Sequence, residues 1–340
     1  MKVRRFICIV ISVMLIPVLL IACGSGGESY PTRNINGYIA WAAGGATDSV
    51  VRTITPIVES QLGQSLVLSN RPGGVGLIAT QYVQSQSPNG YSILFNAESM
   101  TLYKVLGLGD LDHSSFIPVA ILARNVAVLV VPADSPYQTF QDFIDDCIAR
   151  QGRVNVGATG VGALTFNTFS LITMVDGVEF NLVNFDGDGT MIPAVIGGQM
   201  DISVLGQSLA VQYVQSGHLR ALGVFNDERL SVLPDVPTMN ELNPDYGDIQ
   251  LDKWGPFYAA YVREDTDPEI VRILSDAFAN AVNDESFIEF AEMLGLDRLG
   301  LTGQEAIDFL NHWQAMTAWA LYEANATEGV SPADLGIERP

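Results

Sequence analysis

The chain has few of the side chains that most often carry catalysis or bind metal ions. Its 340 residues include three Cys and three His. His113, His218 and His312 are far apart, and none has a partner at the spacing of a metal site. The sequence also lacks a Gly-x-Ser-x-Gly nucleophile turn and the Gly-Lys-Ser/Thr end of a phosphate loop. We therefore predict no metal, no cofactor and no enzymatic activity.

Positive charge is also scarce. There are 17 Lys and Arg against 38 Asp and Glu, which gives a formal net charge of −21 at pH 7. A chain with this charge is a poor partner for nucleic acid or anionic lipid, so we predict no nucleic-acid partner. An anionic ligand would have to be held by short-range dipoles. This is feasible because salt screens more distant charges over about 8 Å at physiological ionic strength.

One long hydrophobic run stands at the N-terminus. The run Phe6–Ile21 follows a basic start and ends in small residues at Cys23, a pattern typical of an export signal. The Cys resembles the lipobox of bacterial lipoproteins, which implies a signal peptide at 1–22, lipidation of Cys23 and a Gly/Ser-rich tether over 23–29. An uncleaved anchor is the alternative. Cleavage would lower Lys and Arg from 17 to 14, leave Asp and Glu at 38, and move the charge from −21 to −24.

The remaining cysteine, Cys147, would then have no intramolecular disulfide partner. It lies in an apolar helical pattern, so we interpret it as a packed hydrophobe. No other run in the chain is long and uncharged enough to span a membrane. The protein is therefore predicted to be extracytoplasmic and to meet the membrane through its lipid anchor only.

Glycine, in contrast, is plentiful and grouped. Three times a β-rich stretch runs into a Gly-rich loop and then into a helical pattern, at residues 43–48, 71–76 and 157–162. Glycine lets the backbone approach a ligand closely. A helix N-terminus offers unpaired N–H donors and the positive end of a dipole, which together bind anions without a cationic side chain. The loops therefore predict a site for a small anion.

Between these loops the pattern alternates between strands and helices. Helical spacing of Val50, Ile54 and Val58 predicts a helix that ends at Gly63, with a kink or a displaced start because of Pro56. Such alternation predicts an α/β fold whose mostly parallel sheets are flanked by helices. Ligands of these sheets bind at the carboxyl ends of the strands, where the Gly loops lie.

The order and spacing of several short motifs resemble one family, the solute-binding proteins of tripartite tricarboxylate transporters, also called the Bug family. The resemblance covers the chain from Tyr30 onward. Its motifs are Gly44–Asp48, the stretch Leu62–Gly74, Pro88–Leu94, Gly197–Asp201, Gly217–Leu222 and Leu233–Thr238. It implies a two-domain clamshell of the periplasmic-binding-protein type, a Venus flytrap, that closes on its solute.

The resemblance also implies an organisation. One domain takes residues 30–130 and 226–340 and the other takes 131–225, with hinge strands at Val126–Val131 and Leu219–Phe225. The protein is expected to be a monomer that captures a small organic carboxylate or amino-acid-like ligand and delivers it to the membrane subunits of the transporter. A lipoprotein that feeds a signalling receptor is an alternative. A surface hydrolase that uses Asp48 or Asp201 is a less favoured one.

The family binds carboxylates through backbone amides, hydroxyls and water. Carried over residue by residue, the resemblance and the Gly loops predict the ligand-binding residues Ala43, Gly44, Gly45, Ala46, Thr47, Asp48, Gly73, Gly74, Gly76, Glu98, Ser99, Ala158, Thr159, Gly160, Gly162, Phe185, Asp186 and Gln207. For Arg71 a carboxylate clamp and a structural role at the loop base both stay open.

One departure from the family bears on the ligand. The family often has Tyr-Lys-Gly where this chain has Phe185-Asp186-Gly187, which makes that edge more acidic. We therefore hypothesise a smaller monocarboxylate, or a zwitterion whose amino group meets Asp186 or Glu98. The stretch Asp186–Gly189 lacks the other ligands of a calcium loop and is interpreted as a turn.

Overall fold

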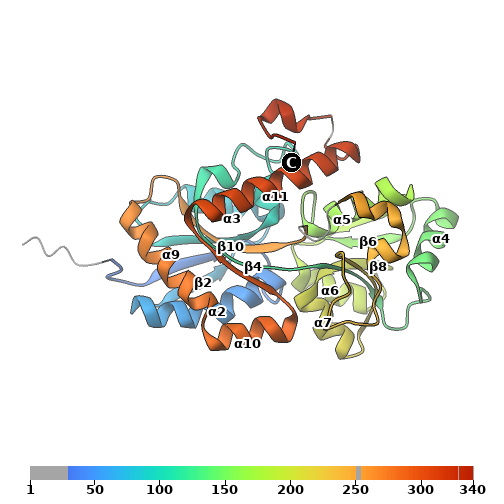
Figure 1. Cartoon of the computed structure of the whole chain (residues 1–340), viewed down its shortest axis with the longest axis horizontal. Coiled ribbons are helices and arrows are strands. Elements are labelled where there is room, and N and C mark those ends of the chain that lie inside the picture. Colours follow the sequence, from blue (N-terminus) through green and yellow to red (C-terminus); the bar gives the residue numbers. More distant parts are fainter. Residues whose placement is uncertain (1–29, 250–253, 328, 340) are drawn as a thin grey trace, which may run out of the picture.

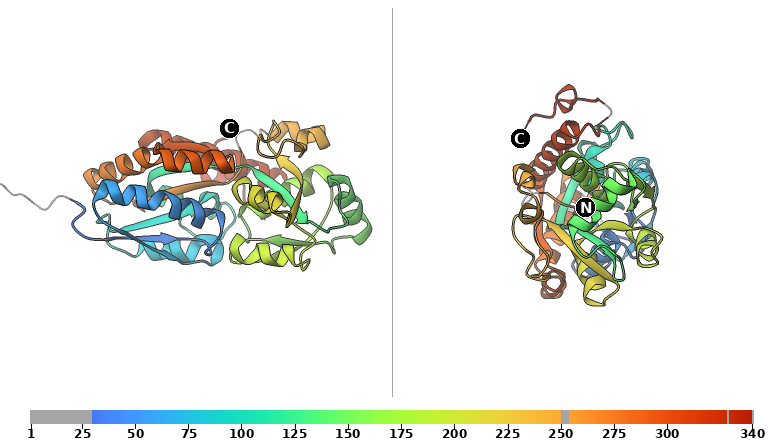
Figure 2. Two further views of the ribbon diagram at one scale, coloured as in Figure 1. Left: turned by 90° about the horizontal axis from the view of Figure 1, so that it is seen from below. Right: turned by 90° about the vertical axis from the view of Figure 1, so that its right-hand side faces the viewer.

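The computed structural model describes residues 30–249, 254–327 and 329–339, which form two lobes side by side along the long axis (Figure 1). The two further views in Figure 2 agree with this arrangement. The predicted signal peptide, Cys23 and the tether lie outside the described residues. Within the described part of the chain, no helix combines the length and the apolar character needed to cross a bilayer.

The first lobe is built on a six-stranded sheet in which β1 pairs in parallel with β2 and β3, while β10 and β11 run antiparallel to their neighbours. Its strand order is β11 (Asp297–Leu301), β4 (Phe116–Arg124), β10 (Phe257–Arg263), β3 (Ser92–Ala97), β1 (Ile35–Ile39) and β2 (Leu66–Asn70). Its α-helices are α2 (Ala46–Leu62), α3 (Leu77–Gln84), α9 (Pro268–Val282), α10 (Glu285–Leu294) and α11 (Gly303–Glu323).

The second lobe is built on a five-stranded sheet in which β6 is parallel to β7 and β8, and β5 is antiparallel to β8 and β9. Its order is β7 (Asn181–Asn184), β6 (Asn155–Ala158), β8 (Ile202–Gly206), β5 (Ala127–Pro132) and β9 (Leu219–Phe225). Its α-helices are α4 (Phe140–Arg150), α5 (Leu164–Asp176), α6 (Asp188–Ile196), α7 (Gln207–Gln215) and α8 (Met239–Leu242).

The predicted α/β clamshell is confirmed, but the prediction of mostly parallel sheets is wrong, because both sheets are mixed. The antiparallel pairings involve β4 and β10 in the first lobe and β5 and β9 in the second, the strands next to the crossings between lobes. Only Asn125 and Val126 separate β4 from β5. Antiparallel neighbours need no helical crossover. A prediction that expects a helix between every two strands therefore misses the direction of these strands.

The second lobe continues beyond its last strand. After Phe225 the chain folds back onto it: Thr238 forms a bridge with Val224, and the Tyr246 hydroxyl donates to Asp176 of α5 at 2.5 Å. Phe225 also contacts the Trp254 ring, with centroids 6.1 Å apart. We therefore propose that the second lobe does not end at Phe225 but also includes residues 226–249 and Trp254. The two strands predicted as hinges both lie within its sheet.

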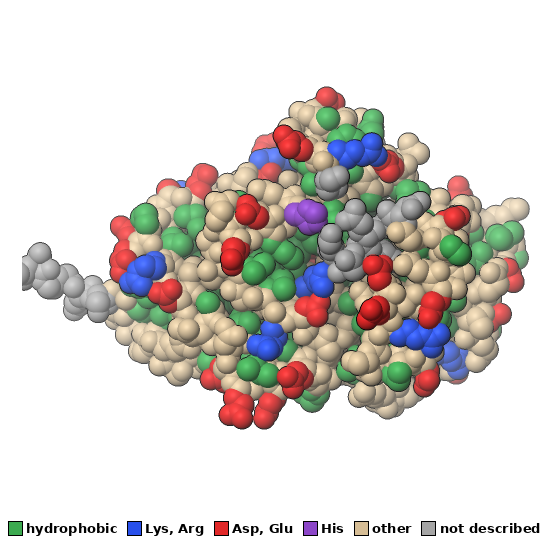
Figure 3. Space-filling view, in the orientation of Figure 1, with side chains coloured by type: hydrophobic (Ala, Val, Ile, Leu, Met, Phe, Trp, Pro, Cys, Tyr) green, Lys and Arg blue, Asp and Glu red, His purple; other side chains and the backbone are tan. Residues whose placement is uncertain are grey.

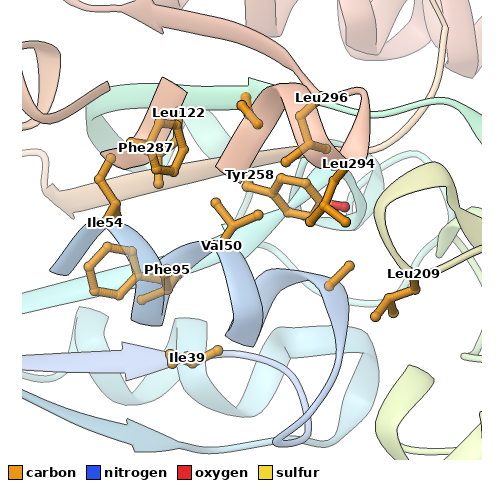
Figure 4. Packing of buried hydrophobic residues seen from close by; sticks show 14 of the residues in the cluster. Ile39, Val50, Ile54, Phe95, Leu122, Leu209, Tyr258, Phe287, Leu294 and Leu296 are labelled. Atoms are coloured by element: carbon orange, nitrogen blue, oxygen red, sulfur yellow. The ribbon is translucent and has the colours of Figure 1, made fainter. Parts of the chain in front are cut away.

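Helices cover both faces of each sheet, and one apolar core runs through both lobes. In β5 the alternate residues Val128 and Val130 face one cluster, and Leu129 faces another, so the strand is apolar throughout. Figure 4 shows part of the shared core, in which Val50 of α2 and Tyr258 of β10 lie near Leu294 of α10. In this conformation the two lobes therefore share apolar contacts beside the cleft.

The local predictions around α2 are mostly confirmed. Val50, Ile54 and Val58 are buried, and Gly63 ends the helix with φ of 67° while its N–H donates to the Glu59 carbonyl. The helix runs as one element from Ala46 through Pro56 to Leu62, so the displaced start that Pro56 suggested is wrong. Cys147 is a free, buried cysteine packed in the core of the second lobe, as predicted.

Candidate functional site

A cavity lies between the lobes, at the ends of the strands where the Gly loops were expected. It holds about 40 Å³ of space that water can occupy, enough for a few water molecules. An organic solute needs more room, so its entry requires the lobes to separate. The lining residues are Trp41, Gly45, Ala46, Thr47, Ala97, Glu98, Thr159, Ala163, Leu164, Asp188, Gly206, Pro256 and Tyr258.

The N-termini of four helices converge on this cavity. They are those of α2, where Gly45 and Ala46 line it, α5 at Leu164, α6 at Asp188 and α7 at Gly206. None of the four N-cap residues makes a side-chain capping hydrogen bond. Their positive dipole ends and first amides therefore face the cavity without the usual caps, which is an arrangement that favours negative charge.

The first Gly loop is shaped by the buried carboxylate of Asp48. Gly44, at φ of 81°, donates its N–H to the Asp48 carboxylate at 3.0 Å, and Arg52 and Asn70 donate to the same carboxylate at 2.9 and 2.8 Å. Burial alone would raise the pKa of Asp48, but these hydrogen bonds outweigh it and the pKa is lowered. Asp48 thus fixes the loop so that Ala46 and Thr47 face the cavity.

Two carboxyl groups line the cavity from opposite lobes. Glu98 of the first lobe is 3% exposed, and its Oε2 has no hydrogen-bond partner. Burial and the nearby Asp188 raise the pKa of Glu98 to about 7. Burial also raises the pKa of Asp188, which lies in the second lobe, to about 6. Both groups can therefore change charge near neutral pH.

Each carboxyl is close to the start of a helix in the other lobe. The backbone amide of Ala46, in α2, favours the charged form of Asp188, and the amide of Leu164, in α5, favours the charged form of Glu98. In both cases burial has the larger effect and the pKa stays raised. The protein's own carboxyls thus take up two of the four positive helix ends.

The lobes meet closely around the cavity. A Cβ atom placed on Gly189 would lie 2.1 Å from the carbonyl oxygen of Ala43, and one on Gly160 would lie 2.7 Å from Val75. Asn125, at the crossing, donates to the Ser208 hydroxyl of the second lobe at 2.8 Å and to the Tyr258 hydroxyl of the first at 2.7 Å. The described conformation is therefore a closed one.

The structure places only some of the predicted residues at the cavity. Gly45, Ala46, Thr47, Glu98 and Thr159 line it. Those not among its lining residues are Ala43, Gly44, Asp48, Gly73, Gly74, Gly76, Ser99, Ala158, Gly160, Gly162, Phe185, Asp186 and Gln207. Among them, Gln207 instead donates to the carbonyls of Leu294 and Gly295 in the first lobe, at 3.2 and 2.5 Å, and so joins the lobes.

The second Gly loop contacts the third loop instead of the cavity. Val75, at φ of 56°, stands between them, and its carbonyl accepts hydrogen bonds from Ser99 and Tyr103 at 3.1 and 2.8 Å. This loop therefore shapes the contact between the lobes.

The acidic edge is shifted by two residues. Asp186 is exposed to solvent, and Asp188 lines the cavity in its place. Gly187, at φ of 149°, turns the chain between them, and α6 begins at Asp188. A rule that looks for the first residue of a helix after a Gly turn would have found Asp188. No local sequence signal identifies Trp41 and Tyr258 as site residues, because only the fold brings them together.

Asp48 and Asp201, the two acids considered for hydrolysis, both make structural contacts away from the cavity. Asp48 holds the first loop, and Asp201 accepts from the Asn155 N–H at 2.7 Å and pairs with Arg150 at 3.1 Å. Neither lines the cavity. Across the described residues no group of three or more His, Cys, Asp or Glu is arranged to hold a metal ion.

Arg71 has a structural place in this conformation. Its guanidinium lies 3.6 Å from the centre of the Tyr82 ring and 5.2 Å from that of Tyr38, and it is not among the residues that line the cavity. Stacking of this kind stabilises a fold by about 1 kcal/mol. Arg71→Ala should therefore lower the free energy of unfolding by about that amount and leave solute affinity within twofold. A carboxylate clamp would instead lose most of its affinity in calorimetry.

The two-lobed fold and the cavity between the lobes define a class, the solute-binding proteins that close on a small molecule. Residues 50–319 match the family model described as tripartite tricarboxylate transporter family receptor. The chain belongs to this family, as its motifs predicted.

Relatives support the same assignment. The chain is 29% identical over 290 residues to the UPF0065 protein in the gbd 5' region of Cupriavidus necator, which covers 83% of this chain and 84% of that one. It is 26% identical to BugT of Bordetella pertussis, over 79% and 82% of the two chains.

Solved structures share the fold. A periplasmic binding protein, BugD, matches with a TM-score of 0.78 at 24% identity, over 92% of this chain and all of that one. MatC from Rhodopseudomonas palustris, with bound malate, matches with a TM-score of 0.77 at 24% identity, over 85% of this chain and all of that one. An R. palustris protein with adipate matches with a TM-score of 0.80 at 23% identity, over 87% of this chain and 98% of that one.

Proposed function

We propose that this protein captures a small carboxylate-bearing solute between its lobes, outside the cytoplasm, and delivers it to the membrane subunits of a tripartite tricarboxylate-type transporter. The observation that carries the proposal is the convergence of four helix N-termini on one interlobe cavity. Such a site attracts a carboxylate through backbone amides, and the described lining residues include no Lys, Arg or His to do so. The malate and adipate bound to proteins of the same fold support this ligand class.

Lipid anchoring through Cys23, a monomeric state and delivery to transporter subunits are parts of this proposal. The proposal includes no nucleic-acid partner, because the chain has 38 Asp and Glu against 17 Lys and Arg, and Figure 3 shows acidic side chains spread over one face. Solute binding shifts the balance from open to closed lobes only if the closed form binds it better. The closed form then carries the solute to the membrane partner.

The proposal predicts an effect of one hydroxyl. Thr47 is buried and lines the cavity at the start of α2. Thr47→Val should weaken binding of the transported carboxylate about tenfold, because a hydrogen bond to a charged group is worth about 1.5 kcal/mol. Calorimetry on the purified protein measures this.

Thr53→Val is the matched control for that experiment. Thr53 lies in the same helix, but its hydroxyl donates to the Ser49 carbonyl at 2.9 Å, and it does not line the cavity. Its replacement should leave affinity unchanged. Equal effects of the two substitutions would contradict a contact between the solute carboxylate and the Thr47 hydroxyl.

A further inference from the structure

The polar lining of the cavity is unbalanced in charge. Glu98 enters it from the first lobe and Asp188 from the second, and no Lys, Arg or His is among its described lining residues. The other side chains there with hydrogen-bonding hydroxyls are Thr47, Thr159 and Tyr258. A site for a solute with two or three carboxylates would place like charges against these two acids, which costs free energy in a buried site.

The position of Glu98 independently indicates a ligand group that carries positive charge. Its side chain is almost fully buried, and its Oε2 accepts no hydrogen bond in the described structure. When Glu98 is ionised, leaving this buried oxygen unpaired is costly, so the atom then needs a donor. Helix amides of the opposite lobes already serve Glu98 and Asp188 in part. The missing component is a group that brings both positive charge and N–H donors.

We propose that the solute carries a protonated primary or secondary amine, which binds between Glu98 and Asp188, and that it carries a single carboxylate. The inference rests on the proposed function, because it concerns the same cavity. The carboxylate would use the remaining amides at the helix N-termini and the hydroxyls of Thr47 and Thr159. The amine would bridge the two lobes, so that it favours the closed form.

A quaternary ammonium does not meet this requirement. Trp41 and Tyr258 line the cavity, and aromatic rings of this kind attract such cations. However, a trimethylated nitrogen has no N–H and would leave Glu98 Oε2 without a donor. The site should therefore prefer an amine to its trimethylated analogue.

The inference predicts the direction of a pH dependence. Glu98 faces Asp188 and the buried Tyr103, Tyr258 and Tyr261, and burial raises the pKa of each of these tyrosines above its ordinary value. The tyrosines therefore stay neutral between pH 5 and pH 8, where the two carboxyls lose their protons. A cation binds the ionised carboxyls better, so its affinity should rise over this range. A dicarboxylate held by protonated acids would show the opposite slope.

The first experiment is a thermal-shift screen of the protein with two sets of compounds, followed by calorimetry on the hits. One set holds the amino acids that carry a single carboxylate, 4-aminobutyrate and its trimethylated analogue, and the other holds malate, succinate, adipate and citrate. We expect hits in the first set, and none for the trimethylated compound. Hits confined to the second set would overturn the inference and leave the proposed function standing. An absence of hits in both would count against the proposed function itself.

The second experiment tests the two acids directly. For an amine-bearing hit, Glu98→Gln and Asp188→Asn should each weaken binding at least about tenfold at pH 8 and flatten the pH profile. Asp186→Asn is the control, because Asp186 is exposed two residues from Asp188. Circular dichroism shows whether each variant is folded. Unchanged affinity in folded Glu98→Gln and Asp188→Asn would overturn the inference.

Discussion

Replacing Glu98 by Gln is expected to stabilise the ligand-free protein at pH 8 and to change its stability little at pH 4. Burial and the neighbouring Asp188 raise the pKa of Glu98 from 4.5 to about 7. Between these values the folded state binds more protons than the unfolded state, so the free energy of unfolding falls as pH rises. At about 1.4 kcal/mol for each pKa unit, the penalty at pH 8 is at most about 3.5 kcal/mol. Gln has a similar shape and no charge, so it escapes this penalty.

Urea denaturation of the wild type and the variant at both pH values measures the effect. Glu289→Gln is the control, because Glu289 is exposed on α10. It should shift the unfolding midpoint little at either pH. If Glu98→Gln destabilised the protein equally at pH 4 and pH 8, the charge of Glu98 would carry no penalty in the closed structure.

A stabilising effect of Glu98→Gln at pH 8 would show that Glu98 lowers the stability of the ligand-free protein. A buried acid that costs free energy in the empty protein is a common feature of binding and catalytic sites. The same substitution should weaken the binding of an amine-bearing solute, so stability and affinity would change in opposite directions. A purely structural Glu98 would show no such opposition.

Gly189→Ala is expected to prevent full closure of the lobes. Its added methyl group would lie 2.1 Å from the Ala43 carbonyl oxygen, on the backbone of the opposite lobe. The φ of Gly189 lies outside the left-handed region, so each lobe on its own accommodates Ala. The clash therefore exists only in the closed form. Because apparent affinity scales with the population of the binding-competent form, affinity should fall at least about tenfold.

Small-angle scattering and calorimetry test this second prediction. With saturating solute, the wild type should become more compact, and the variant should stay close to its ligand-free dimensions. Gly247→Ala is the matched control, because a Cβ atom at Gly247 meets nothing within 4 Å and its φ is not left-handed. Normal closure and affinity in Gly189→Ala would contradict the contact between α6 and the first Gly loop.

The sequence was most informative where local physics decides the structure. The apolar spacing of Val50, Ile54 and Val58 and the stop at Gly63 predicted α2 because helix periodicity and a left-handed C-terminal glycine are local properties. Pro56 was misleading, since the helix runs through that exposed position without a break. The family motifs predicted the clamshell.

The candidate site could be predicted only in part. Thr47, Thr159 and Glu98 follow strands or open helices, so local pattern placed them near the cavity. The second Gly loop has the same local pattern, but packing against the third loop removes it from the cavity. Asp188 was missed in favour of Asp186 because a two-residue shift at a Gly turn decides which of the two carboxyls lines the cavity. Such differences depend on how the lobes meet, which no local pattern encodes.

The most direct test of the account is a crystal structure of the protein with the solute that calorimetry identifies. We expect its carboxylate at the N-terminal amides of the helices that line the cavity, near Thr47 and Thr159. Its amine should lie within hydrogen-bonding distance of Glu98 and Asp188. A solute bound elsewhere would contradict the account, for instance in the polar cavity between α11 and residues 335–339, which Lys104 also lines.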